Sequence, residues 1–208
     1  MNYATLVSNI QNFVEDDSAE LIASLDQIIN QAEELIFQRL PSLPCFRQIS
    51  TGNLVVGTFD YTVANARMIR QVFVTDSSGD VSYLDHRIDS YLRDYHPKTS
   101  TKATPEMYST KSAGTSGTVI TLAPTPSDTL AFQVEFIAPV TGLSSSNTTT
   151  WLGNNAENVL LKATLYEVST FLKNAEMVQL YKAQFDEAIA LFQQEMGRNY
   201  TAEYNGGI

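Results

Sequence analysis

The spacing of apolar residues changes twice along this chain, and that change limits the folds it can adopt. Apolar residues recur with helical spacing near both ends, while turn signals between them separate short runs of strand-forming residues. Each pair of terminal helices is too small to be stable alone, so we expect the pairs to pack together. The sequence therefore predicts an α+β fold. In it, N- and C-terminal helix pairs form one helical bundle, with an inserted antiparallel β domain and an extended C-terminal tail.

Two helices are predicted before residue 44. An apolar stripe predicts the first over Tyr3 to Val14, and a longer stripe predicts the second up to Leu40. Asp17, followed by Glu20, has the spacing of a capping box that would open the second helix. Prolines after Leu40 cannot continue the backbone hydrogen bonds, so they end it.

The middle of the chain is predicted to be a compact antiparallel sheet or small sandwich, with a short helix from Asp85 to Asp94 that turns Ile88 and Leu92 inward. The predicted strands are Phe46–Ser50, Leu54–Phe59, Ile69–Thr75, Val81–Leu84, Met107–Thr110, Val119–Leu122 and Leu130–Ala138.

The helical spacing returns after a Ser/Thr-rich loop that ends at Thr150. Two apolar stripes, with a break near Asn174, predict the C-terminal helix pair, which ends at Met196. We therefore divide the chain into N-terminal helices (1–44), a β-rich insert (45–149), C-terminal helices (150–196) and an extended partner-docking tail (197–208).

The charge balance is acidic, with 13 Lys and Arg against 23 Asp and Glu and a net charge of −10. Binding to nucleic-acid phosphates needs a surplus of Lys and Arg, so sequence-independent nucleic-acid binding is disfavoured. An acidic surface would instead let DNA slide past. Neither a membrane-spanning apolar run nor a signal peptide is recognisable, so we expect synthesis in the cytoplasm and no membrane partner.

Few residues favour catalysis or metal binding. His86 and His96 lie near Asp85 and Asp89, but they lack the spacing of a metal-binding helix. Cys45 is the only cysteine, which excludes an intramolecular disulfide and a thiolate cluster for zinc. We find no phosphate-binding loop and predict no catalytic residue, no cofactor and no metal.

Two charged segments have alternative interpretations. The run Glu15–Asp16–Asp17 could chelate calcium, but it lacks the loop ligands and the turn glycine, so helix capping is the simpler interpretation. Three lysines make residues 97–118 locally basic, which indicates either a solvated loop or an electrostatic contact with an acidic neighbouring subunit. They are Lys98, Lys102 and Lys111.

The C-terminal tail is polar and rich in glycine, so it cannot bury a core of its own. Ordering such a segment costs backbone entropy that a partner surface must offset. We expect the tail to dock on another chain. Its anchors would be two aromatic residues, Tyr200 and Tyr204, and the apolar Ile208. Arg198 lies beside them in the sequence and belongs to the same docking segment.

The segment from Thr150 to Leu161 resembles a signature of bacteriophage adaptor proteins, in which a Trp-Leu-x-x-Asn-Ala-Pro-Asp-like stretch opens the first C-terminal helix. Here Trp151, Leu152 and Asn155 carry the match, and Glu157-Asn158 replaces Pro-Asp. We expect Trp151 to be mostly buried at the helix start. Further similar pieces follow in the expected order: Met1–Val7, Ala32–Arg39, Pro105–Tyr108, Leu122–Ser127, Glu167–Lys173 and Gln179–Tyr181.

What the resemblance implies is a non-enzymatic structural subunit of the virion, a head-to-tail adaptor. Such adaptors form a ring, here expected to hold twelve copies, between the portal protein and the distal tail nozzle, or a neck protein. Their tails clasp the portal, and DNA passes through the ring during ejection. Three alternatives stay open: a neck or stopper protein of a long-tailed phage, a carbohydrate- or receptor-binding module using the β domain, and a small hydrolase or metal enzyme.

Overall fold

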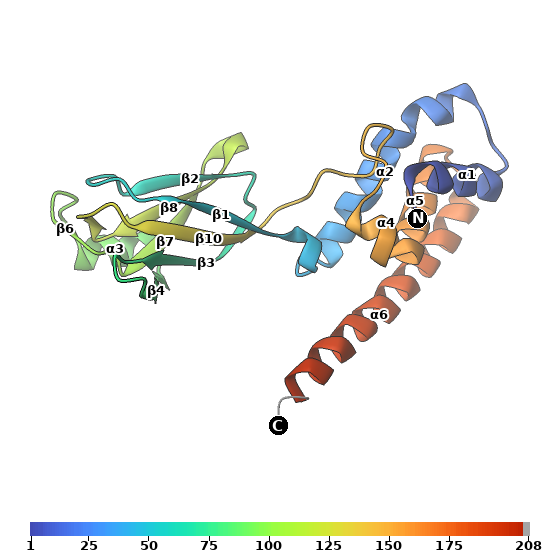
Figure 1. The fold of residues 1–208 in the computed structure, drawn as a ribbon. Coiled ribbons are helices and arrows are strands. Elements are labelled where there is room, and N and C mark those ends of the chain that lie inside the picture. Colours follow the sequence, from blue (N-terminus) through green and yellow to red (C-terminus); the bar gives the residue numbers. More distant parts are fainter. Residues whose placement is uncertain (206–208) are drawn as a thin grey trace. The chain divides into compact units, whose positions relative to one another are not determined.

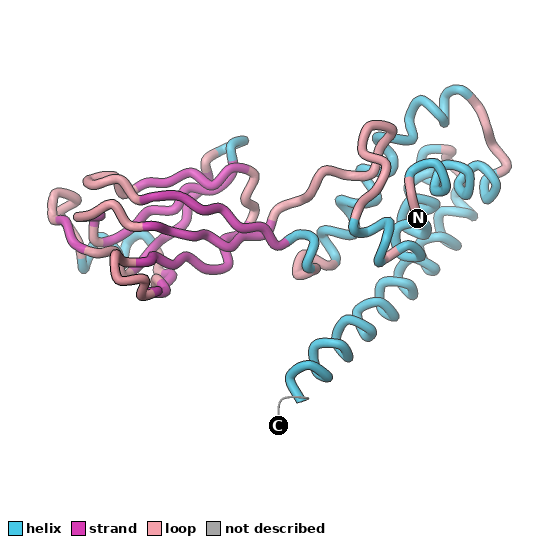
Figure 2. Tube along the Cα trace, viewed as in Figure 1, coloured by secondary structure: helices cyan, strands magenta, loops and turns pink. Residues whose placement is uncertain are grey.

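The structure, a computed structural model, describes the backbone of residues 1–205 and the side chains of residues 1–197. The chain forms two compact units, drawn in Figure 1. One, the helical unit, combines Met1–Pro41 with the chain from Val140 onward, and the other, the β unit, spans Ser42–Pro139. The predicted α+β class is confirmed, since strands occupy the middle of the chain and helices dominate both ends (Figure 2).

The helical unit is organised around α5 (Glu157–Phe171), which contacts every other helix of the unit. Because α2 comes from before the β unit and α6 from after it, α5 joins the two ends of the chain into one bundle. The other helices described in this unit are α1 (Tyr3–Val14), α2 (Ala19–Arg39), α4 (Trp151–Asn155) and α6 (Ala175–Asn205).

Two polar residues lie fully inside this bundle, on α5 itself. Thr164 and Ser169 are buried, and each hydroxyl donates to a carbonyl one turn earlier: Thr164 to Leu160 at 2.8 Å, and Ser169 to Leu165 at 2.7 Å. A buried hydroxyl without a partner would cost stability, whereas these bonds satisfy it within the helix. Helix α5 can therefore bury more than one face.

The first predicted helix is confirmed with its bounds, but the predicted cap of the second is wrong by one residue. The Oγ of Ser18, rather than Asp17, accepts the Leu21 N–H at 3.3 Å, and Asp16 Oδ1 accepts the Ser18 N–H at 2.8 Å. An Asp-Asp-Ser run offers three good capping residues in succession, so composition alone does not select one.

The polar loop that precedes α4 is fixed to α1 and α2 by carboxylates and backbone groups. Glu33 Oε2 accepts the Leu143 N–H at 2.9 Å, and Asp26 Oδ2 accepts from the Ser145 hydroxyl at 2.9 Å. The Tyr3 N–H donates to the Thr148 carbonyl at 3.0 Å. A hydrogen bond from the Tyr3 side-chain hydroxyl is the main reason that the pKa of Asp26 lies below its usual value. These contacts attach the loop to the N-terminal helices.

The β unit contains two four-stranded sheets and one two-stranded sheet. The first, sheet A, has the order β1-β10-β3-β4 and is antiparallel throughout; the second, sheet B, has the order β2-β8-β7-β5. The strands are β1 (Arg47–Asn53), β2 (Asp60–Ala64), β3 (Met68–Thr75), β4 (Val81–Tyr83), β5 (Asp85–His86), β6 (Lys102–Ala103), β7 (Met107–Ser112), β8 (Gly117–Ala123), β9 (Thr125–Pro126) and β10 (Ala131–Ile137).

Sheets A and B share one apolar core, as in a small sandwich. Val72 and Val134 from sheet A belong to the same buried cluster as Ile120 and Leu122 from sheet B. Alternation along the strands sends every second residue of sheet A into this cluster and the rest to its outer face. The sandwich interpretation is therefore confirmed.

Three local predictions in the β unit are wrong. The segment Leu54–Phe59 is a loop rather than a strand, since Gly57 has a positive φ of 83° and the Val55 N–H bonds to the Tyr61 hydroxyl at 2.8 Å. The helix predicted from Asp85 is α3 (Asp89–Tyr95), because Asp85–His86 pairs in parallel with β7. On α3 only Leu92 is buried, while Ile88 is exposed. The unit is also not purely antiparallel, since β5–β7 and β6–β9 are parallel pairs.

Among the residues that the structure describes, no helix is long and apolar enough to cross a membrane.

The buried Glu33 should make the stability of the helical unit depend on pH. Burial raises its pKa, although hydrogen bonds from the Leu143 N–H and the Thr150 hydroxyl oppose the shift. The folded chain therefore holds this proton more tightly than the unfolded chain does. As a result, the contribution of Glu33 to the free energy of unfolding falls as the pH rises from about 4.3 through the raised pKa.

We expect Glu33→Gln to remove this fall, because the amide keeps an acceptor for Leu143 and carries no charge. Urea unfolding between about pH 4 and pH 7 measures the difference from the unmodified protein. Glu34→Gln, which changes the neighbouring, less buried glutamate, is the matched control and should keep the unmodified slope. Equal slopes in all three proteins would contradict the assignment.

Candidate interaction site at the start of the C-terminal helices

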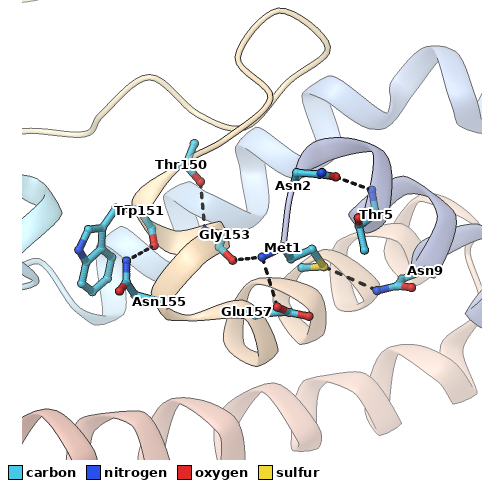
Figure 3. A network of polar contacts seen from close by, with 9 residues as sticks. All are labelled: Met1, Asn2, Thr5, Asn9, Thr150, Trp151, Gly153, Asn155 and Glu157. Carbon is cyan, nitrogen blue, oxygen red and sulfur yellow. Dashed lines mark hydrogen bonds and ion pairs between the residues drawn. The ribbon is translucent and has the colours of Figure 1, made fainter.

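The matched signature folds into a short helix whose ends are closed by its own side chains. Thr150 caps α4, since its Oγ1 accepts the Gly153 N–H at 3.1 Å. Asn155 Nδ2 donates to the Trp151 carbonyl at 2.9 Å, as drawn in Figure 3. Trp151 and Asn155, two of the three predicted signature residues, are thus joined directly.

The N-terminal segment packs onto this short helix, a contact that sequence reasoning missed. The amino group of Met1 lies 3.2 Å from Glu157 Oε2 and also donates to the Gly153 carbonyl (Figure 3). A Cβ atom placed on Gly153 would lie 2.4 Å from the Met1 carbonyl oxygen, so the close approach needs glycine there. Glu157, which stands where the family signature has proline, thus holds the N-terminal segment at the start of α5.

The other signature residues differ in burial. Leu152 is buried in the helical unit, as its apolar character predicts, and Asn155 is exposed. Trp151 is mostly buried, as predicted, but not fully, so part of the residue stays open to solvent. A partly open tryptophan beside a helix start can contribute both to packing and to a partner contact.

A hollow of about 190 Å³ lies between the start of α5 and α6. Leu191, which is exposed, and Phe192, which is buried, both line it, and Glu157 and Glu195 are among its charged residues. An exposed leucine beside carboxylates gives this part of the helical unit a mixed apolar and acidic surface.

The predicted end of the last helix is wrong, because α6 continues past Met196 to Asn205. Gly197, taken as the start of an extended tail, lies inside α6, since a single glycine weakens a long helix without ending it. Three predicted docking residues, Arg198, Tyr200 and Tyr204, belong to this helix, but their side chains lie outside the described residues. Ile208 lies outside them altogether.

The two histidines do not share a site with the nearby carboxylates. His86 is exposed; its ring packs 4.9 Å from that of Tyr108, and its Nε2 lies 3.5 Å from Thr110 Oγ1. Asp85 pairs instead with Arg87 at 3.0 Å. Within residues 1–197, no cluster of three or more His, Cys, Asp or Glu side chains could hold a metal ion.

One lysine of the basic segment is neutralised inside the β unit. Lys111 Nζ lies 2.7 Å from Asp60 Oδ2, and the Thr121 hydroxyl donates to Asp60 Oδ1. Although burial alone acts to raise the pKa of Asp60, these hydrogen bonds hold it below its usual value. Lys111 is thus part of a structural ion pair.

The contact between Gly153 and the N-terminal segment yields a direct test. Gly153→Ala should lower the free energy of unfolding by about 1–3 kcal/mol, because the new methyl group would force the backbone near Met1 to move. Gly197→Ala is the matched control: it also lies in a helix, and apart from its own stretch of helix no atom of the described residues lies within 4 Å of its added Cβ. It should be neutral or stabilise the protein by up to about 1 kcal/mol. Chemical denaturation measures both, and equal effects would contradict the proposed contact.

Comparison with known proteins agrees with the sequence resemblance. A family model described as SU10 adaptor protein matches residues 1–206, which is nearly the whole chain and includes both units. A search of curated proteins found no match. Because the match covers the helix start at Trp151 and the β insert together, the chain belongs to the SU10 adaptor protein family.

Proposed function

We propose that this chain is a non-enzymatic, structural head-to-tail adaptor of a bacteriophage virion. Twelve copies would form a ring between the portal protein and the distal tail nozzle or neck protein, and DNA would pass through the ring as cargo during ejection. The observation that carries this proposal is the match to the adaptor family over residues 1–206.

The division of the chain into two units supports an adaptor, which must contact different proteins on its two sides. The helical unit places the adaptor signature, the N-terminal segment and the start of α5 at one site. The β unit has its own core and its own exposed apolar residues. Two separate contact surfaces on one subunit suit a protein that joins a portal to a tail.

The charge distribution supports passage of DNA and differs between the units. The helical unit contains 14 Asp and Glu but only 5 Lys and Arg, whereas the β unit has 9 acidic and 8 basic residues. The net charge of −10 therefore belongs almost entirely to the helical unit. An acidic wall repels the DNA backbone and so avoids retaining it, which is what a conduit requires.

Portal docking is assigned to the C-terminal stretch that contains Arg198, Tyr200, Tyr204 and Ile208. Tyrosine and arginine contribute disproportionately to protein–protein binding because they bring a large contact area with a polar tip. The buried residues of α6 end at Phe192, so the stretch after Gly197 can be changed without removing a core side chain among those described.

Binding to purified portal rings tests this assignment. Removal of residues 198–208 should abolish retention on immobilised portal, and Tyr200→Ala with Tyr204→Ala should weaken it about tenfold or more, as expected for two aromatic anchors. Asn199→Ala with Thr201→Ala is the matched control from the same stretch and should bind normally. Circular dichroism verifies that every variant keeps its helices and strands.

Equal portal binding by the truncated and complete chains would refute the assignment of the docking residues. Failure of the complete chain to bind portal rings at all would count against the head-to-tail role itself.

A further inference from the structure

Sheet A ends in two open edges. Within the described residues, β1 pairs only with β10, and β4 pairs only with β3. Strand β1 has seven residues, Arg-Gln-Ile-Ser-Thr-Gly-Asn, and its register with β10 is regular. Native proteins usually protect such an edge with charged side chains, proline, a bulge or a very short strand. Strand β1 carries one charged residue, Arg47 at its start, and no proline or bulge, so the rest of the strand can still accept a partner. Strand β4 has only three residues, which limits the length of any pairing at that edge.

Three of the four large exposed apolar residues of sheet A lie on its two edge strands, and the fourth, Met68, begins the central strand β3. Ile49 on β1 is 61% exposed, and Val81 and Tyr83 on β4 are 50% and 65% exposed. The central strands turn Gln71, Gln133 and Glu135 to the same face, together with Phe73, whose ring lies 5.3 Å from that of Tyr83. A protein that simply faced solvent here would have no reason to concentrate apolar side chains at both edges.

Exposed apolar residues outside sheet A also fall into two groups, one next to β1 and one after β4. Val55 and Val56, both exposed, follow β1 in the loop to β2. Ile88 and Tyr95, also exposed, lie in the segment that runs from β5 through α3. Among the large exposed apolar residues described in the β unit, only Met68 falls outside these two groups. The unit thus has two different apolar sides, as a head-to-tail contact between identical subunits needs.

Strand direction allows the two edges to meet. Strands β1 and β3 are both antiparallel to β10, and β4 is antiparallel to β3, so β4 runs opposite to β1. If β1 of a second copy lay beside β4, the pair would be antiparallel and the alternation of the sheet would continue across the contact.

One register brings matching side chains together on the outer face. With Ile49 of one copy opposite Tyr83 of the other, Thr51 lies opposite Val81. An aliphatic residue then faces an aromatic one, which is a favourable cross-strand pair. The pairing ends there, because β4 stops at Tyr83 and Asp85 belongs to β5 in sheet B.

We propose that β1 of one copy pairs with β4 of the next, so that sheet A continues from subunit to subunit. The proposal rests on the ring suggested under Proposed function and names the contact that closes it. Each copy offers both edges, and a head-to-tail contact of this kind gives a ring when its rotation closes.

Disulfide cross-linking of the full-length chain tests the contact. In a Cys45→Ser background, Thr51→Cys and Val81→Cys are combined in one chain. Strands β1 and β4 of the same copy are separated by two strands, or about 14 Å, which is too far for a disulfide. Every disulfide therefore links two copies, and mild oxidation should give a ladder of covalent oligomers on a denaturing gel.

Single-cysteine proteins determine whether the contact is head-to-tail. A mixture of the Thr51→Cys and Val81→Cys chains should give a covalent dimer, and neither chain alone should. A dimer from Thr51→Cys alone would mean that β1 meets β1, which would overturn the proposal.

Point variants test the apolar residues of the contact. Ile49→Lys, added to the double-cysteine chain, should abolish the ladder. Met68→Lys is the matched control, since Met68 is similarly exposed at 51% but lies on neither of the two edge strands that would pair. This variant should leave the ladder unchanged. Both sites are exposed, so the thermal melts should be unaltered.

Oxidation of the double-cysteine chain alone and on immobilised portal rings separates this proposal from the proposed function. Retention on portal without disulfides in either sample would overturn the β1–β4 contact and leave the adaptor role intact. A ladder without portal retention would support the contact and count against portal docking. If the chain forms no disulfides in either sample and is not retained on portal, both the β1–β4 contact and the adaptor role are overturned.

Discussion

The burial of α5 is the interaction on which the helical unit depends. Its partners α2 and α6 lie on opposite sides of the β unit in sequence, so the bundle forms only when distant parts of the chain meet. Closing a loop of this length costs only slightly more than closing a short one, because the entropic cost grows with the logarithm of length. Thr164 and Ser169 satisfy their hydroxyls inside α5, which lets the helix contact neighbours on several sides without a buried unpaired polar group.

Helices marked by the regular spacing of apolar residues could be predicted from the sequence. Features that depend on contacts between distant residues could not. The helical stripes gave α1 its bounds and located the break before α6. In contrast, the run Leu54–Val56 has the composition of a strand, yet the bond from Val55 to Tyr61 and the conformation of Gly57 make it a loop. Strand preference was outweighed there by a turn and a side-chain contact that span only a few residues, which composition does not reveal.

The interaction site shows the same limit. Trp151, Leu152 and Asn155 could be selected from the sequence because they form a recognisable signature, and the structure places them on one short helix. Gly153 and Glu157 could not be selected, since their importance comes from Met1, more than 150 residues away in sequence. The replacement of proline by glutamate at position 157 is the one sequence signal for this contact, and its role depends on the N-terminal amine 3.2 Å away.

The β unit begins and ends at neighbouring points of one ladder: Arg47 pairs with Ile137, and the Ala138 N–H donates to the Phe46 carbonyl at 3.1 Å. A domain whose ends meet in this way can be lengthened, shortened or exchanged without changing the distance that its flanking chain must span. Mutation can therefore alter the sheets and loops of the insert while the helices that flank it keep their sequence register. The insert can therefore vary independently of the helical unit, which makes it a replaceable module.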